Sequence, residues 1–134
     1  MWEDSFIGSA RVKDTLFGDT SGTLSDSAHG GDDQITGLGS TDYLFGDASR
    51  MTDDAEGGHD HLDGGPGNDL LVGDASQMLD DAQGGNDCLF GRDGSDSLRG
   101  DAVSMMSNSQ GGDDHLYGDH AAAATNRDGA ISTD

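Results

Sequence analysis

Single apolar residues recur along this chain at a fixed interval, each in the middle of a three-residue segment. One column of these residues contains Ile35, Leu62, Leu89 and Leu116. A second column contains Leu16, Leu44, Leu71 and Leu98. Side chains alternate between the two faces of a strand, so the central residue points to one face and its neighbours to the other. The pattern predicts very short strands whose leucines form continuous ladders only when the strands are stacked.

The apolar columns belong to a repeat with a step of 27 residues. Four glycine pairs mark this step: Gly30-Gly31, Gly57-Gly58, Gly84-Gly85 and Gly111-Gly112. Residues 14–29 match the last part of a repeat unit with one extra residue. Residues 4–7 resemble a degenerate strand that precedes this partial unit. A constant step of this size is typical of solenoids. We therefore predict an all-β fold, a parallel β-roll or β-solenoid with about four 27-residue coils.

Each coil is expected to contain two strands and one broad loop. A short turn over residues 64–69 leads to a strand at 70–72, and a long turn over 73–87 leads to a strand at 88–90. A third apolar column is interpreted as a buried row inside the long turn, and its members are Leu24, Met51, Met78 and Met105. Frequent glycines disfavour helix by about 1 kcal/mol each. Only Ala121–Ala124 suggests a helical turn.

The repeat also predicts a domain plan. Residues 1–13 are expected to form a degenerate N-terminal coil or cap, residues 14–119 the roll, and residues 120–134 a C-terminal tail that is partly disordered. Six residues flank the core leucines and either cover a partner surface or pack on the long loop: Tyr43, Phe45, Leu70, Val72, Phe90 and Tyr117. A roll without a strong C-terminal cap exposes its last leucine row, so end-to-end self-association is a further hypothesis.

Composition adds an electrostatic problem to this picture. The 134 residues include 27 acidic and six basic ones, for a formal charge of −21, while hydrophobic content is only 31%. All acidic residues except Glu3 and Glu56 are aspartates, and aspartate together with 23 glycines is typical of turns. Compacting such a chain meets strong self-repulsion, which cations relieve. Hard divalent cations suit carboxylate and carbonyl oxygens.

Several other classes of function have little support. Nucleic-acid binding needs clustered Lys and Arg, which are absent. No apolar run approaches the ~20 residues of a membrane span, and no cleaved secretory signal is visible at the N-terminus. Cys88 is the single cysteine, so no internal disulfide is expected. His61, Cys88 and His115 share a column and are interpreted as surface residues, with a zinc or copper site as the less favoured alternative.

Residues 64–72, Gly-Gly-Pro-Gly-Asn-Asp-Leu-Leu-Val, match the nonapeptide G-G-x-G-x-D-x-U-x at every fixed position. Residues 91–99 lack only the second glycine, and residues 37–45 keep the first glycine, the aspartate and the leucine. Over roughly residues 14–119 the chain therefore resembles the RTX, or haemolysin-type calcium-binding, repeat family. The resemblance implies a parallel β-roll with calcium between successive turns, secretion by a type I system and folding outside the cell.

The resemblance also assigns metal ligands in columns. On the short-turn side these are Asp42, Asp69 and Asp96, with the turn glycines Gly37, Gly39, Gly64, Gly67, Gly91 and Gly94. On the long-turn side they are Asp33, Asp60, Asp87 and Asp114. The column of Asp47, Asp74 and Asp101, which also contains Asp19 and Asp119, is either a ligand column or a set of Asx turns or caps. Most of Asp26, Asp53, Asp54, Asp80 and Asp81 are interpreted as solvated acid.

The function expected from these features is calcium binding coupled to folding. About five to eight Ca²⁺ ions would sit between stacked turns, because no single turn supplies the six to eight oxygens that calcium takes. The setting would be a secreted, extracellular bacterial protein or a module of one. Two alternatives stay open: a C-terminal calcium-dependent module of a larger secreted enzyme, toxin or adhesin, and a roll that binds ice or a glycan. Repeated aspartates indicate ligands rather than one catalytic site, so an enzyme is not expected.

Overall fold

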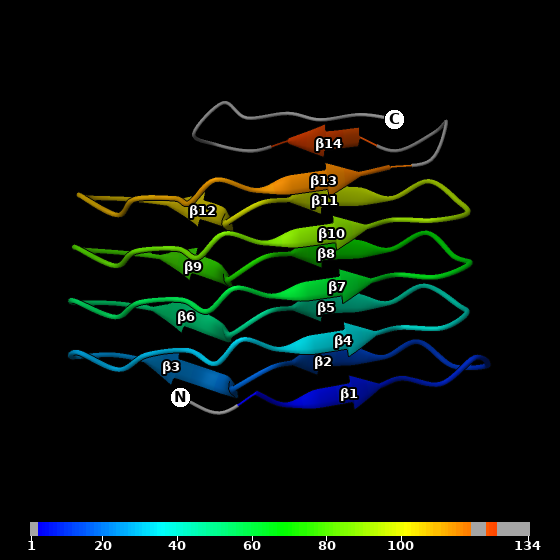
Figure 1. The fold of residues 1–134 in the computed structure, drawn as a ribbon, viewed down its shortest axis with the longest axis horizontal. Coiled ribbons are helices and arrows are strands. Elements are labelled where there is room, and N and C mark those ends of the chain that lie inside the picture. Colours follow the sequence, from blue (N-terminus) through cyan, green and yellow to red (C-terminus); the bar gives the residue numbers. More distant parts are fainter. Residues whose placement is uncertain (1–2, 119–122, 126–134) are drawn as a thin grey trace.

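The computed structural model describes residues 3–118 and 123–125, and in this part the chain is a flattened parallel β-solenoid (Figure 1). Strands in successive coils pair in parallel, with His61 of one coil beside Cys88 of the next. The described residues contain 14 strands and no helix. The predicted all-β solenoid with a 27-residue coil is confirmed. No described helix is long and apolar enough to pass through a membrane.

Three sheets run along the stack. Sheet A contains β1 (Ser5–Ile7), β4 (Gln34–Thr36), β7 (His61–Asp63), β10 (Cys88–Phe90) and β13 (His115–Tyr117). Sheet B contains β2 (Thr15–Phe17), β5 (Tyr43–Phe45), β8 (Leu70–Val72), β11 (Ser97–Arg99) and β14 (Ala123–Thr125). Sheet C contains β3 (Thr20–Leu24), β6 (Ala48–Met51), β9 (Ala75–Met78) and β12 (Ala102–Met105).

Sheet C corrects the prediction of two strands and one broad loop per coil. Each of the first four coils has a third strand, which occupies part of the predicted long turn. In β6 the buried residues are Ala48 and Met51, the two ends of a four-residue strand. This spacing does not alternate with a period of two, so the usual sequence signal of a half-buried strand is missing.

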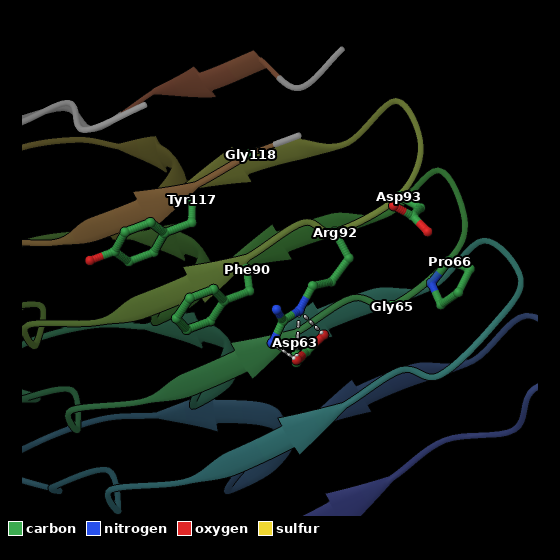
Figure 2. Close-up of a pocket in the computed structure, with 8 residues that line it drawn as sticks. All are labelled: Asp63, Gly65, Pro66, Phe90, Arg92, Asp93, Tyr117 and Gly118. Atoms are coloured by element: carbon green, nitrogen blue, oxygen red, sulfur yellow. Dashed lines mark hydrogen bonds and ion pairs between the residues drawn. The ribbon is translucent and has the colours of Figure 1, made fainter. Parts of the chain in front are cut away.

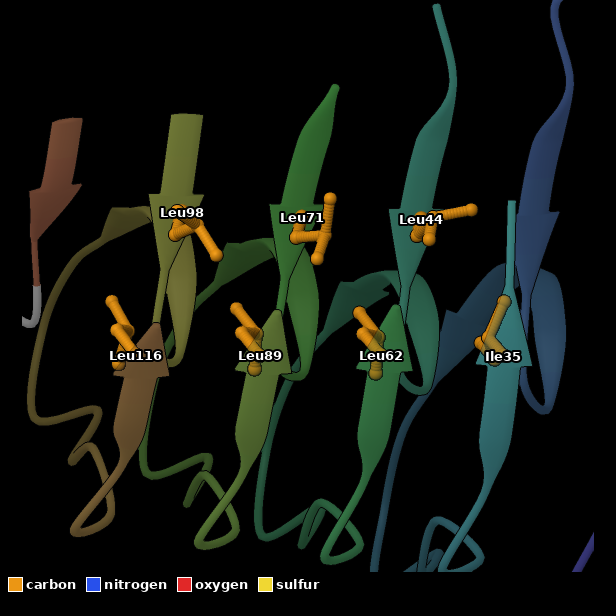
Figure 3. Packing of buried hydrophobic residues seen from close by; sticks show 7 residues of the cluster. All are labelled: Ile35, Leu44, Leu62, Leu71, Leu89, Leu98 and Leu116. Atoms are coloured by element: carbon orange, nitrogen blue, oxygen red, sulfur yellow. The ribbon is translucent and has the colours of Figure 1, made fainter. Parts of the chain in front are cut away.

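The two faces of the flattened coil enclose a leucine core (Figure 3). Figure 3 shows the side chains from sheet A and those from sheet B pointing toward one another. The fully buried members are Ile35, Leu44, Leu62, Leu71, Leu89, Leu98 and Leu116. Burying a leucine contributes about 1.5–3 kcal/mol, so one leucine per strand stabilises the fold only because the row is continuous.

A second core packs on sheet C, at the end of each coil away from the short turns (Figure 1). Its buried members are Ala48, Met51, Ala55, Ala75, Met78, Ala82 and Ala102. Leu24 and Met105 pack against this cluster from the two ends. The predicted third apolar column is therefore buried or partly buried, and its residues lie in strands of sheet C rather than in a loop.

The N-terminal coil is longer than the others. Ser5 pairs with Gln34, whereas Gln34 pairs with His61, so the first coil contains two residues more than the 27-residue step. The register also shifts between Thr20 and Thr23, where one of the extra residues lies. The second extra residue lies before Thr15, in the first short turn, because Thr15 pairs with Tyr43 whereas Ser5 pairs with Gln34.

The prediction of a helical turn at Ala121–Ala124 is wrong for the part that is described. Ala123 and Ala124 belong to β14, which pairs with Ser97 and Leu98 of β11. Pairing with an existing sheet edge satisfies the backbone of a short segment, which an isolated helical turn does not. Ala121, Ala122 and most of the predicted C-terminal tail lie outside the described residues.

Candidate metal centres

Ten aspartate side chains are buried in the described part of the chain, and all ten belong to the three candidate ligand columns, whose member Asp19 is exposed. They are Asp33, Asp42, Asp47, Asp60, Asp69, Asp74, Asp87, Asp96, Asp101 and Asp114. The five aspartates interpreted as solvated are exposed: Asp26, Asp53, Asp54, Asp80 and Asp81. Aspartate is rarely buried without a partner, because removing an ionised carboxylate from water is costly. The buried columns therefore require a physical explanation.

One carboxylate oxygen of each ligand-column aspartate links two coils. On the long-turn side, the backbone N–H of Asp33 donates to Oδ1 of Asp60 at 2.7 Å, and that of Asp60 donates to Oδ1 of Asp87 at 2.8 Å. On the short-turn side, the N–H of Asp42 donates to Oδ1 of Asp69 at 2.8 Å. Each bond fixes the carboxylate against the preceding coil. Because Oδ1 is held in this way, the position of the second carboxylate oxygen, Oδ2, is fixed as well.

The second oxygen has no hydrogen-bond partner in six of these residues. Oδ2 is buried and unpaired in Asp33, Asp42, Asp60, Asp69, Asp74 and Asp87. A buried acceptor without a donor costs about 1–3 kcal/mol, and more when it is charged. Native structures hold few such atoms, and a regular column of them indicates a missing positive group.

Glycine keeps a small oxygen-lined space open at each short turn. A Cβ placed on Gly37 would lie 2.7 Å from Oδ2 of Asp42 and 2.7 Å from the carbonyl oxygen of Gly64. The same construction on Gly64 gives 2.7 Å to Oδ2 of Asp69 and 3.0 Å to the carbonyl oxygen of Gly91. A carboxylate of one coil and a carbonyl of the next thus face the same space. A carboxylate oxygen and the partially negative carbonyl oxygen repel each other in that position unless a cation or a proton lies between them.

The long-turn side has the same construction from different glycines. Gly46 faces Oδ2 of Asp60 and the carbonyl oxygen of Gly73, both so close that a Cβ would overlap with them. One coil further on, Gly73 faces Oδ2 of Asp87 and the carbonyl of Gly100. The glycine that follows each of β2, β5 and β8 therefore borders a candidate centre.

The third aspartate column closes the long turn across its base. Oδ1 of Asp47 accepts the N–H of Gly58 at 3.1 Å, and Oδ1 of Asp74 accepts that of Gly85 at 2.7 Å. The partner is 11 residues away in the sequence, so the bond is not the local one of an Asx turn. Gly57 lies between Asp47 and Asp74 of successive coils. Burial and, next, the charge of Asp60 raise the pKa of Asp47, so this column lies near the long-side candidate centre as well.

These long-side carboxylates form a polar seam between the two apolar cores. Burial, with the Asp60 charge as the next cause, raises the pKa of Asp47 from 3.8 to about 9. Burial also raises the pKa of Asp60 to about 8, against the opposing hydrogen bond from Asp33. The pKa values of Asp74 and Asp87 lie well above the ordinary range for the same first reason. Without a cation, the seam therefore favours protonated carboxyls over carboxylates.

The pKa shift of Asp69, in the short-turn column, is smaller than those of Asp47 and Asp60. Burial raises the pKa of Asp69 to about 6, and hydrogen bonding from Asp42 lowers it in part. The pKa of Asp42 is raised by burial too. Burial also raises the pKa of Asp33, the first aspartate of the long-side column, to about 6, so the larger shifts belong to the inner coils of the long side.

The donor set fits a hard divalent cation. The groups around each space are carboxylate and carbonyl oxygens, the ligands that calcium prefers, and the glycines leave room beside them. No three His, Cys, Asp or Glu side chains of the described residues converge as a ready metal cluster. An ion at these points would complete its shell with backbone carbonyls, as the sequence argument for two stacked turns requires.

One candidate position was missed by the sequence analysis. Asp14 belongs to a turn with a similar space: a Cβ on Gly8 would lie 2.7 Å from Oδ2 of Asp14 and 2.7 Å from the carbonyl of Gly37. In contrast to Asp42 and Asp69, Oδ2 of Asp14 accepts a hydrogen bond, from the N–H of Ser9. The N–H of Asp14 also donates to Oδ1 of Asp42 at 2.8 Å. The extra residue in the first short turn hid this position, because it breaks the nonapeptide spacing.

The His and Cys column lies where the sequence placed it. His61, Cys88 and His115 are adjacent residues of β7, β10 and β13 in sheet A. His61 packs against Phe90, with ring centroids 5.0 Å apart. The three side chains do not form a metal cluster in the described part of the chain.

A parallel β-solenoid with a glycine-aspartate turn in every coil is the architecture of calcium-binding repeat proteins. The family model of the RTX calcium-binding nonapeptide repeat (4 copies) matches residues 27–49, 54–76 and 81–102, about half of the chain. The chain belongs to this family, as the sequence resemblance indicated. No curated protein and no solved structure is significantly similar to it. The repeat is a structural calcium-binding unit, not a catalytic one.

Replacing Gly73 by alanine should damage both packing and metal binding. Its Cβ would overlap with the carbonyl of Gly100 and Oδ2 of Asp87. We expect the Gly73→Ala protein to lose about 1–3 kcal/mol of unfolding free energy in saturating calcium, measured by urea denaturation. The matched control is Gly22→Ala, where the nearest atom is Thr20 Oγ1 at 3.3 Å and the change should stay within about 0.5 kcal/mol. Equal losses in the two variants would contradict this account of the seam.

The metal-free roll should become more stable as the pH falls. The pKa values of Asp47 and Asp60 are raised to about 9 and about 8 in the fold, above the ordinary 3.8, so folding takes up protons. That contribution is fully present below about pH 4 and is lost as the pH rises through 8–9. Circular dichroism and X-ray scattering of calcium-free protein should therefore report more structure at about pH 5 than at pH 9.

The calcium-saturated sample is the internal control for this experiment. Calcium binds ionised carboxylates, so its midpoint concentration should fall as the pH rises, which is the opposite trend. Metal-free protein that gains structure with rising pH would show that the buried carboxyls do not control folding.

Proposed function

We propose that this protein is a roll that folds when calcium binds between its coils. The observation that supports this most directly is the column of buried Oδ2 atoms facing carbonyl oxygens of the next coil. On the short side the proposed ligands are Asp42, Asp69 and Asp96 with the backbone of their turns. On the long side they are Asp33, Asp60, Asp87 and Asp114 together with Asp47, Asp74 and Asp101.

Calcium supplies the positive charge that the seam lacks. The chain has a formal charge of −21, and about five to eight divalent ions would cancel roughly half or more of it. A ligand that binds the folded state and not the unfolded chain adds its binding free energy to stability. With leucine ladders only one residue deep, we expect this added stability to decide whether the roll of residues 14–119 folds.

We further infer an extracellular setting. A chain that needs calcium to fold stays extended where calcium is scarce and becomes compact where calcium is plentiful, which suits export before folding. Secretion by a type I system, as an independent protein or as a module of a larger secreted enzyme, toxin or adhesin, is consistent with membership in the RTX family.

A calcium titration followed by far-UV circular dichroism tests the proposal. The β-signal should appear cooperatively with calcium and not with the same concentration of magnesium, because Mg²⁺ requires a smaller octahedral shell and keeps its waters. In the Asp60→Asn protein, the amide oxygen still accepts the N–H of Asp33 while the charge is lost. The midpoint calcium concentration should rise by about tenfold, equivalent to ~1.4 kcal/mol.

Asp54→Asn is the matched control, because Asp54 is exposed and belongs to the same coil. Its midpoint should stay within about twofold of the unaltered protein. A β-signal that is already complete in calcium-free buffer at neutral pH would refute the proposed function.

A further inference from the structure

A hollow of about 590 Å³ lies on the outer face of sheet A, where three strands lead into their turns (Figure 2). It is separate from the buried aspartate columns, because it is formed on the solvent side of the sheet. Asp63 of β7, Phe90 of β10 and Tyr117 of β13 are neighbours in the sheet and line it. Pro66 and Asp93, from two short turns, form the opposite side (Figure 2).

The floor of the hollow is an aromatic pair. The rings of Phe90 and Tyr117 stack with centroids 4.7 Å apart and an angle of 6° between their planes. Both side chains remain half-exposed. In the lower coils the same sheet position holds Ile7, Thr36 and Asp63, so the repeat itself does not require an aromatic residue there. Stacking alone does not mark a site, because Phe17 and Phe45 of sheet B also stack, at 4.8 Å. The Phe90–Tyr117 pair differs because it lines a hollow and offers a ligand a flat apolar surface.

A rigid polar group stands beside the aromatic pair. Nε of Arg92 donates to Oδ2 of Asp63 at 2.9 Å, and the guanidinium also lies 4.9 Å from the centre of the Phe90 ring. The ion pair and the ring hold the guanidinium in one orientation (Figure 2). An arginine fixed in this way keeps further N–H donors, and the exposed carboxylate of Asp93 adds acceptors at the rim.

The charges around the hollow restrict the class of ligand. An anionic ligand would meet Asp63, Asp93 and a chain of charge −21. A cationic ligand would compete with Arg92, which already occupies a face of Phe90. A neutral molecule with a flat apolar face and a rim of hydroxyl groups meets neither problem. The C–H face of a pyranose ring packs on aromatic side chains, while its hydroxyls bond to arginine and carboxylate groups.

We propose that the juxtaposition of Phe90, Tyr117 and the Arg92–Asp63 pair is a binding site for a neutral, pyranose-containing oligosaccharide. The site differs from the calcium centres in place and chemistry. Its residues come from three successive coils and meet only when the coils are stacked. The dependence of this site on calcium rests on the proposed function. Calcium stacks the coils and so forms the site. Bound saccharide in return lowers the calcium concentration needed for folding.

Isothermal titration calorimetry in saturating calcium tests this with cellohexaose, laminarihexaose, maltohexaose and mannohexaose as probes. We expect saturable binding of at least one of them and none of the anionic hexagalacturonate. Failure of all four neutral probes to bind protein that is folded by circular dichroism would overturn the proposal. Preferential binding of hexagalacturonate would overturn it as well.

The repeat itself offers substitutions that the fold already accepts. Tyr117→Thr introduces the residue that Thr36 provides in the same column, and Arg92→Leu introduces the one that Leu38 provides at the equivalent turn position. Each should weaken binding of the neutral hexasaccharide by about tenfold. The control is Tyr43→Thr, which removes an aromatic from sheet B and introduces the residue found at Thr15; its affinity should be unchanged. Equal affinity of all three variants would place the saccharide elsewhere and overturn the proposed site.

The experiment separates this inference from the proposed function. Protein that folds with calcium but binds no neutral probe refutes the saccharide site and leaves calcium-coupled folding intact. Protein that binds a neutral hexasaccharide equally well with and without calcium supports the saccharide site and refutes calcium-coupled folding. Protein that neither folds with calcium nor binds a probe refutes both.

Discussion

The structure depends on how the roll keeps negatively charged oxygens buried between its coils. In the two ligand columns that the family resemblance assigns, Oδ1 of each aspartate accepts a backbone N–H of the preceding coil, and Oδ2 lies beside a space that a carbonyl oxygen of the next coil also lines. Oxygen faces oxygen, without a donor from the described residues for six of the Oδ2 atoms. Ordinary folds do not keep such an arrangement, because desolvation and repulsion both oppose it. A divalent cation between these oxygens would bind both of them, so the arrangement would link two coils instead of destabilising the fold.

The other features of the fold follow from this constraint. Glycine borders each centre because any side chain would fill the space between the oxygens. The cores are divided, with leucine rows between sheets A and B and alanine and methionine rows on sheet C, because the polar seam runs between them. On the proposed function, stacking, metal binding and folding are one event, because each core contains only one or two buried side chains per strand.

Sequence reasoning reached the parts of this plan that repeat with a simple period. The leucine columns and the glycine-aspartate columns were visible because each coil places them at the same offset. The third strand was not, since Ala48 and Met51 are buried at the two ends of β6 rather than in alternation. The hydrogen-bond partner of Asp47 was also hidden, because Gly58 is brought close only by closure of the long turn. Asp14 was missed for a third reason: one inserted residue moves it out of register, although a Cβ on Gly8 would still meet its Oδ2 and the carbonyl of Gly37.

The most direct test of the central claim is to locate calcium in a crystal of the calcium-loaded protein from its anomalous scattering at long wavelength. Our account predicts peaks in the interior, between Oδ2 of Asp60 and the carbonyl of Gly73 and at the equivalent places in each coil. Peaks confined to the exposed aspartates of the long-turn tips, such as Asp53 and Asp54, with the interior empty, would contradict it.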